Sequence, residues 1–145
     1  MIDYAVEFDV QKPPSEVFAV LDDFASTPRW NSRCVEVKQV SPGPHQEGAR
    51  LLYVYRDPGR QGQMDGVISA YEPNRALKMQ YHDRMMEISV GFKLEPKGSG
   101  THVQHEIQIS PRSLVARLMT PVIRGATRKQ TQDSVEKLKA LLKTS

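Results

Sequence analysis

The sequence has a single cysteine, Cys34, and it has no apolar run of about 18 residues or more. One cysteine cannot form an internal disulfide, which is typical of proteins in the reducing cytoplasm. Without a long apolar run, the chain has no candidate transmembrane helix. Its first residues lack the basic and then apolar pattern of a signal peptide. We therefore expect a cytoplasmic protein.

The motifs of several common chemistries are also missing. The chain has no Gly-x-Ser-x-Gly elbow, and the segment 98–100 lacks the Lys and Ser/Thr that complete a phosphate-binding loop. His102 and His105 lie three residues apart on a predicted strand, so their side chains point to opposite faces and cannot bind one metal ion together. The net charge of +3 is too small to indicate a nucleic-acid partner. We expect no metal, no cofactor and no nucleic acid.

What is present is a chain of 145 residues that reads as one domain, 1–145. Pro13 and Pro14 end a first strand and begin a short helix, and a second short turn covers 26–30. Short turns separate most of the predicted strands, which favours antiparallel pairing of neighbours. Alternating apolar and polar residues predict seven strands, over 2–10, 33–41, 48–57, 63–72, 75–83, 85–95 and 101–110.

A long helix is predicted for the last third of the chain, from about 112 to 142. Ser110 has the character of its N-cap, with Pro111 at the first helical position. Pro121 should kink or split this helix near its first third. The long helix is the one element able to cover a face of the sheet, so we expect the sheet to curl around it.

The predicted helix is apolar at both ends and not in its middle. The first end carries Leu114, Leu118, Met119, Val122 and Ile123, and the last carries Val135, Leu138, Leu141 and Leu142. The face between them offers Gly125, Ala126, Thr127, Gln130 and Ser134. Because a helix that only closed a core would carry large apolar residues there, these small and polar residues predict a cavity beneath the helix.

This order of elements resembles the START-like superfamily, also called helix-grip or SRPBCC proteins. Within it, the chain most resembles the polyketide cyclase/dehydrase and lipid-transport group. The matching stretches are 10–18, 24–31, 35–37, 71–75, 98–103 and 138–143. The resemblance implies an α+β helix-grip fold, in which a seven-stranded antiparallel sheet curls around a long C-terminal helix. Two short helices follow the first strand. Members include cyclases, lipid carriers and hormone- and quinone-binding proteins, so the fold does not settle the function.

His105 is the strongest single candidate for a polar site residue. On the predicted strand it shares a face with Val103, Ile107 and Ile109. An imidazole pointing into an apolar cavity can act as a general base or hold a ligand oxygen. The alternative is a core histidine that a neighbouring side chain such as Gln130 satisfies.

The other candidates are aromatic, sulfur-containing or small polar residues that we expect around the cavity. Tyr81, Met64 and Met86 should point inward, although ordinary core packing explains them equally well. The inward side of the strand that holds Tyr53 is ambiguous. In the family the region of Trp30 borders the cavity mouth, and a lone tryptophan can also be a packing anchor. From the helix, Ala126, Gln130 and Ser134 complete the set, and the polar pair would orient an apolar ligand.

The sequence favours binding of a small hydrophobic ligand, such as a lipid, polyketide or aromatic compound. A cyclase or dehydratase that uses His105 for proton transfer is the enzymatic alternative, which the sequence leaves open. A quinone or lipid chaperone at a membrane surface is a third. Arg117, Arg124, Arg128 and Lys139 fall on one side of a continuous helix and would contact anionic lipid weakly, unless they form an ordinary solvated face. The sequence gives no oligomeric state.

Overall fold

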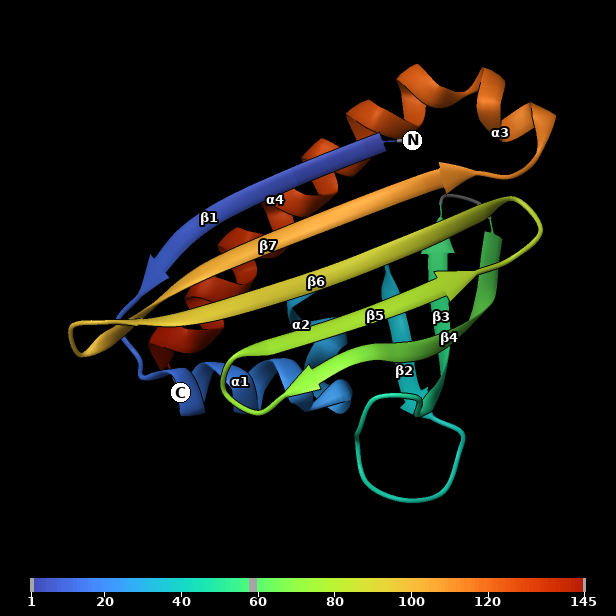
Figure 1. Cartoon of the computed structure of the whole chain (residues 1–145). Helices are drawn as coiled ribbons and strands as arrows, with labels where there is room; N and C mark the ends of the chain where they lie inside the picture. The colour runs from blue at the N-terminus through green and yellow to red at the C-terminus, as the bar shows by residue number, and fades with distance from the viewer. Residues whose placement is uncertain (1, 58–59, 145) are drawn as a thin grey trace.

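The structure of the protein, a computed structural model, describes residues 2–57 and 60–144. It is an α+β fold in which one curled antiparallel sheet holds a long C-terminal helix, as expected (Figure 1). The helices are α1 (Pro14–Asp22), the 3₁₀ turn η1 (Phe24–Ser26), α2 (Thr27–Trp30), α3 (Leu114–Leu118) and α4 (Thr120–Thr144). The strands are β1 (Ile2–Val10), β2 (Cys34–Gln39), β3 (Arg50–Asp57), β4 (Arg60–Glu72), β5 (Ala76–His82), β6 (Met86–Lys97) and β7 (Gly100–Pro111).

The sheet has the strand order β1-β7-β6-β5-β4-β3-β2, and every neighbouring pair is antiparallel. From β2 to β7 each strand pairs with the next in sequence, as the short turns between most of them favour. The helical segment between β1 and β2 separates these two strands, and β1 pairs with β7 instead. As a result, β1 and β2 form opposite edges of the curled sheet.

The segment after β1 folds as its prolines predict. Pro13 is the N-cap of α1 and Pro14 occupies its first turn, where a missing N–H costs no hydrogen bond. Val17, Phe18 and Leu21 are buried, so one face of α1 joins the core. The following α2 ends at Trp30, which is also buried.

The start of the C-terminal helical region differs from the prediction. Ser110 and Pro111 belong to β7, where they pair with Glu87 and Met86 of β6. The N-cap is Ser113, whose hydroxyl accepts a hydrogen bond from the Ala116 N–H. Strand pairing has therefore extended β7 past the residues that resembled a helix start. The expected break is confirmed, because α3 ends at Leu118 and α4 begins at Thr120, with Pro121 in its first turn.

The two apolar ends of the helical region have different environments. Val135, Leu138 and Leu142 of α4 are buried in the main core, as predicted. Leu114 and Leu118 of α3 are instead 73% and 74% exposed. The apolar residues of the first end therefore do not pack on the sheet as those of the last end do, since α3 follows the end of β7 (Figure 1).

The break also changes the predicted basic stripe. Arg117 lies on α3, whereas Arg124, Arg128 and Lys139 lie on α4, so their angles on one continuous helix do not apply. Lys139 forms an ion pair with Glu136 at 3.4 Å. Among the described residues, none of the helices combines the length and apolarity needed to cross a bilayer.

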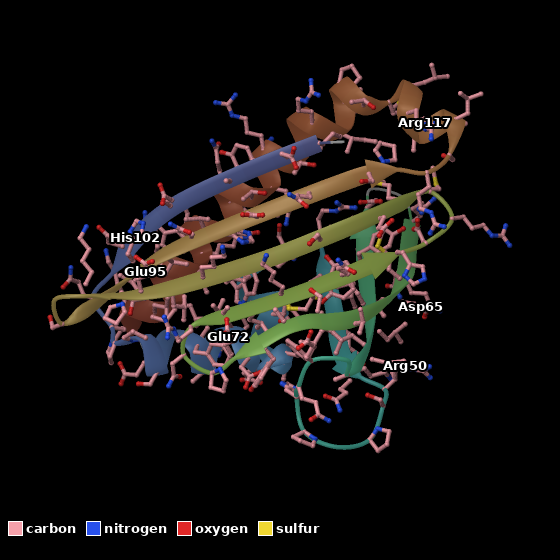
Figure 2. The ribbon with its side chains drawn as sticks, viewed as in Figure 1. Arg50, Asp65, Glu72, Glu95, His102 and Arg117 are labelled. Atoms are coloured by element: carbon pink, nitrogen blue, oxygen red, sulfur yellow. The ribbon has the colours of Figure 1, made fainter. Side chains whose placement is uncertain are left out.

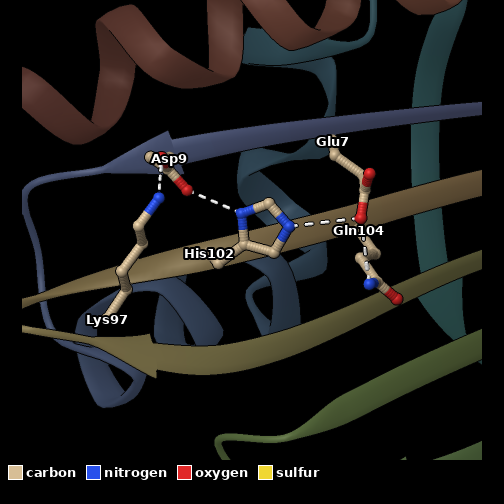
Figure 3. A network of polar contacts seen from close by, with 5 residues as sticks. All are labelled: Glu7, Asp9, Lys97, His102 and Gln104. Carbon is tan, nitrogen blue, oxygen red and sulfur yellow. Dashed lines mark hydrogen bonds and ion pairs between the residues drawn. The ribbon is translucent and has the colours of Figure 1, made fainter.

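A polar network on the outer face links β1, β7 and β6 (Figure 3). His102 Nδ1 lies 2.6 Å from Asp9 Oδ1, and its Nε2 lies 3.2 Å from Glu7 Oε1. Lys97 and Gln104 donate to the same two carboxylates. These carboxylates raise the pKa of His102 above its ordinary value of 6.5, because their hydrogen bonds favour the imidazolium. The network therefore reinforces the pairing of the edge strand β1.

Two glycines offer a matched test of close packing in the fold, because one lies against an aromatic ring and the other lies at an exposed helix position. Gly66 of β4 pairs with Tyr81 of β5, and a Cβ at Gly66 would collide with the Tyr81 ring. Gly125 lies on an exposed part of α4 with no atom within 4 Å of the position of a Cβ. We predict that Gly66→Ala lowers the free energy of unfolding by about 1–3 kcal/mol. Gly125→Ala should raise it by up to about 1 kcal/mol, because alanine favours the helix. Urea denaturation measures both, and equal effects of the two changes would contradict the packing.

Candidate functional site

A small apolar chamber lies between the inner face of the sheet and α4. Its volume is about 100 Å³. Trp30 contributes from α2, and Thr127 and Thr131 contribute from the middle of α4. The sheet supplies Val37, Tyr53, Met79, Tyr81, Ile88, Val90, Phe92, Ile107 and Ile109. The space that the middle of the helix predicts is therefore present.

A larger open cleft adjoins this chamber, with a volume of about 590 Å³. The two share Arg33, Ile88, Ile109, Thr127 and Gln130 in their linings, so they lie next to each other with these side chains at their border. An apolar cavity that holds benzene measures about 150 Å³, which is larger than the chamber alone. The chamber alone is therefore too small for a ligand larger than benzene, whereas the cleft is not.

Aromatic rings make up much of the chamber wall. Trp30 meets Phe92 edge to face at a centroid distance of 5.8 Å, and Tyr53 lies 4.9 Å from Tyr81. Burial raises the pKa of Tyr53 to about 12 and that of Tyr81 further still, because it disfavours the phenolate. Both phenols are therefore protonated at neutral pH, when each hydroxyl can donate a hydrogen bond.

Gln130 connects α4 to the segment that follows α2. Its Nε2 donates to Asn31 Oδ1 at 2.8 Å and lies 3.4 Å from Ser134 Oγ. The Ser32 hydroxyl approaches Gln130 Oε1 at 3.5 Å. These contacts hold the wall of the cleft at the point where it meets the chamber.

The cleft has charged groups at its rim, and two of them form an ion pair with each other. Arg33 forms an ion pair with Asp57 at 2.6 Å, and its guanidinium lies 5.5 Å from the centre of the Tyr55 ring. Arg60 donates to the Tyr55 hydroxyl at 2.9 Å. Asp83 accepts hydrogen bonds from the backbone N–H groups of Met85 in the β5–β6 turn and Met86 at the start of β6. The rim is thus polar, whereas the chamber is apolar.

Three residues of the chamber lining also hold a buried donor for which the described residues supply no hydrogen-bond partner. These donors are Trp30 Nε1, Arg33 Nε and Thr131 Oγ1. An unpaired buried donor costs about 1–3 kcal/mol. A ligand oxygen that reached one of them would recover part of this cost.

Comparison with known proteins identifies the fold and the family. The model of the family described as polyketide cyclase / dehydrase and lipid transport matches residues 1–143. The chain belongs to this family. Membership is consistent with hydrophobic-ligand binding and with cyclase activity. No curated protein matches the chain in sequence.

Solved structures share the fold over nearly the whole chain. The Zhui aromatase/cyclase from Streptomyces sp. R1128 has a TM-score of 0.81 at 10% identity, covering 97% of this chain and 93% of that one. A START superfamily protein from Mycobacterium smegmatis has a TM-score of 0.79 at 13% identity, covering 98% and 97%. A protein from Mesorhizobium loti has a TM-score of 0.75 at 22% identity, covering 99% and 98%. Such identities establish a common fold and leave the ligand open.

The structure of this polyketide cyclase/dehydrase and lipid-transport family member places most of the predicted ligand residues around the cavity. Trp30, Tyr53 and Tyr81 line the chamber, whereas Met64, Met86 and Ala126 line the cleft. Gln130 lines both. Trp30 is 5% exposed, so it lies in the interior and not at the mouth.

Two predicted residues lie elsewhere. Among the described residues, neither lining includes His105 or Ser134. His105 packs flat against Phe92 at 4.1 Å between ring centres, and its Nδ1 lies 3.0 Å from the Gly91 carbonyl oxygen. The partner of this buried histidine is therefore a backbone carbonyl and not a neighbouring side chain such as Gln130. Gly125 is exposed and is in neither lining, whereas its helix neighbours Ala126 and Thr127 line the cleft.

Sequence reasoning missed the polar rim of the cleft. Arg33 and Asp57 lie 24 residues apart and meet because β2 pairs with β3. Asp83 of the β5–β6 turn and Lys129 of α4 both line the cleft, although they are far apart in the sequence. No local pattern in the sequence predicts that these residues meet at the cleft, apart from the short turns that indicate strand order.

The two histidines of β7 give a pH prediction. Burial lowers the pKa of His105 to about 4, while that of His102 lies above 6.5. In an NMR titration, the His105 ring should stay neutral well below pH 6.5, and the His102 ring should become charged above it. The unfolded chain protonates both near pH 6.5. His105 therefore destabilises the fold as pH falls through that value. The contribution of His102 is complete below 6.5 and is lost as pH rises through its folded pKa.

The variant His102→Gln assigns the His102 signal, and His105 is then the ring among the remaining three histidines that stays neutral to the lowest pH. A midpoint near 6.5 for His105 would show that its ring is solvated, in conflict with its position against Phe92.

Proposed function

We propose that the protein binds a small hydrophobic molecule, such as a lipid, polyketide or aromatic compound, between the sheet and α4. The observation that carries this proposal is an apolar chamber that borders an open cleft, with five lining residues shared between them. A ligand can enter through the cleft and bury one end among aromatic rings. Family membership supports the same class of ligand.

Burial of apolar ligand surface would supply most of the affinity, at about 25 cal/mol per Å² before losses of entropy. We infer that Trp30, Tyr53 and Tyr81 surround the buried end, where the two phenols can donate to a ligand oxygen. In the cleft, Met64 and Met86 would adapt to an irregular outer part. Ala126 leaves room there, and Gln130 would orient the ligand at the junction.

A cyclase or dehydratase that uses the same cavity is the second candidate. The family description and the similarity to an aromatase/cyclase fold support it. Such an enzyme needs a proton-transfer group that touches the substrate. His105 is placed against Phe92 and outside the described linings. The carboxylates of the cleft accept hydrogen bonds or form ion pairs, as Asp57 does with Arg33. We therefore rank binding above catalysis.

A carrier of lipid or quinone that works at a membrane surface is the third candidate. The observation in its favour is the set of apolar side chains that α3 and the start of α4 expose beside the cleft.

Filling the junction between chamber and cleft tests the binding proposal. Thr127 is buried and lines both spaces. We predict that Thr127→Phe weakens binding of N-phenyl-1-naphthylamine, an uncharged dye that fluoresces in apolar surroundings, by about tenfold or more. The matched control is Gln132→Phe, which adds the same ring at an exposed position of α4. Fluorescence titration measures the Kd of each variant.

Thr127→Leu repeats the test with a smaller side chain, and thermal melting shows whether each variant is folded. Equal affinity of folded Thr127→Leu, folded Thr127→Phe and the natural protein would overturn binding in this cavity. An equal loss in Gln132→Phe would assign the dye to the helix surface, which also contradicts the proposal.

A further inference from the structure

The most unusual surface of the molecule is at the break between α3 and α4. Leu114 and Leu118 are more than 70% exposed, and Val115 and Val122 more than 60%. Met119 is 45% exposed. Isolated exposed apolar residues are common, but five large ones within nine positions indicate a surface that is covered by a partner.

The same stretch carries only positive charge. Residues 107–132 contain Arg112, Arg117, Arg124, Arg128 and Lys129, and they contain neither Asp nor Glu. This segment is more positive than the whole chain, whose net charge is +3. We call these five cations and the five exposed apolar residues of 114–122 the basic apolar surface. Figure 2 shows Arg117 at the α3 end, away from the carboxylates Glu72 and Glu95 on the strands.

The basic apolar surface adjoins the mouth of the cleft. Val122 and Lys129 belong both to it and to the cleft lining. Across the cleft lie Met85 and Met86 of the β5–β6 turn and the start of β6. The backbone N–H of Arg112 donates to the Met85 carbonyl, and its side chain donates to the Asp83 carbonyl, so this turn is fastened to the start of the surface.

We propose that the basic apolar surface docks the protein on an anionic phospholipid bilayer, with the mouth of the cleft facing the membrane. The exposed leucine, valine and methionine side chains would enter the boundary between headgroups and acyl chains. The arginines would extend along this boundary and keep their charges among the phosphates. A hydrophobic ligand would then pass between bilayer and cleft without crossing water.

The charge argues against the simplest other occupant, a second copy of the chain. A two-fold dimer through this surface would bring its five cations opposite the same five cations. An anionic bilayer complements both the charge and the exposed apolar groups. Docking does not require that the cavity be filled, so this proposal and the ligand-binding proposal are tested separately.

Vesicle flotation tests the docking surface. We expect the natural protein to bind phosphatidylcholine vesicles that contain about 30 mol % phosphatidylglycerol far better than pure phosphatidylcholine vesicles at low salt. Binding should fall steeply when the salt concentration rises to about 0.5 M. Leu114→Ser with Leu118→Ser, and Arg117→Gln with Arg124→Gln, should each lower the partition coefficient about tenfold or more.

Two double variants on the rest of the surface serve as matched controls. Lys38→Gln with Lys93→Gln removes the same charge from exposed positions of β2 and β6. Val35→Ser with Val40→Ser removes apolar groups that are 37% and 54% exposed. Both controls should bind vesicles nearly as the natural protein does. The residues changed are all exposed, and thermal melting checks that each variant is folded.

Each contrary result overturns the proposal in a recognisable way. No binding to anionic vesicles at low salt rejects docking outright. An equal loss of vesicle binding in the control variants would show that binding depends on net charge or overall hydrophobicity and not on the basic apolar surface. A concentration-dependent dimer that the Leu114→Ser and Leu118→Ser pair abolishes, without vesicle binding, would make a second copy the occupant. Dye binding by the Leu114→Ser and Leu118→Ser variant should be unchanged, which separates loss of docking from loss of the cavity.

Discussion

The packing of the second half of α4 in the concave sheet is the constraint on which the rest of the structure depends. Leu138 and Leu142 are each 1% exposed, and they join the core that holds Phe8 and Val103. Each such side chain contributes roughly 1.5–3 kcal/mol when it is fully buried. This anchoring fixes the rotation of the helix. Because rotation is fixed, the side chains one and two turns earlier must face the sheet, whatever their polarity.

The cavity follows from that rotation. Thr127, Gln130 and Thr131 occupy positions where a continuous core would have leucine or isoleucine, and they are too short or too polar to fill the space. The opposite wall is lined by aromatic and branched side chains of the sheet, which keep the chamber apolar. Gln130 also holds Asn31, so the segment after α2 is tied to the same helix. Thr127 and Gln130 therefore lie where the chamber borders the cleft, and most of the chamber lining is apolar.

The break between α3 and α4 has a different consequence, which is an exposed apolar surface. At Met119 the chain leaves α3 and starts α4, so the apolar residues of 114–119 are freed from the rotation that the anchored half imposes. They lie in a stretch of sequence that carries cations and no carboxylates, and Val122 at the start of α4 lines the cleft. One helical region thus combines an anchor in the core, a cavity wall and an exposed surface. The three occur in order along α4 and α3, from the C-terminal end backward.

The sequence by itself determined the strands, their antiparallel order, the two short helices and the helix that the sheet surrounds, because alternation, proline positions and short turns act over a few residues. It also indicated the cavity, since small and polar residues interrupt an apolar helix face. The tertiary structure alone decided that Ser110 and Pro111 extend a strand, because pairing with β6 outweighs a local helix start. It decided that His105 packs on Phe92 and that Arg33 meets Asp57. It also left Leu114 and Leu118 exposed, because burial depends on which surface lies opposite and no local pattern records where the sheet ends.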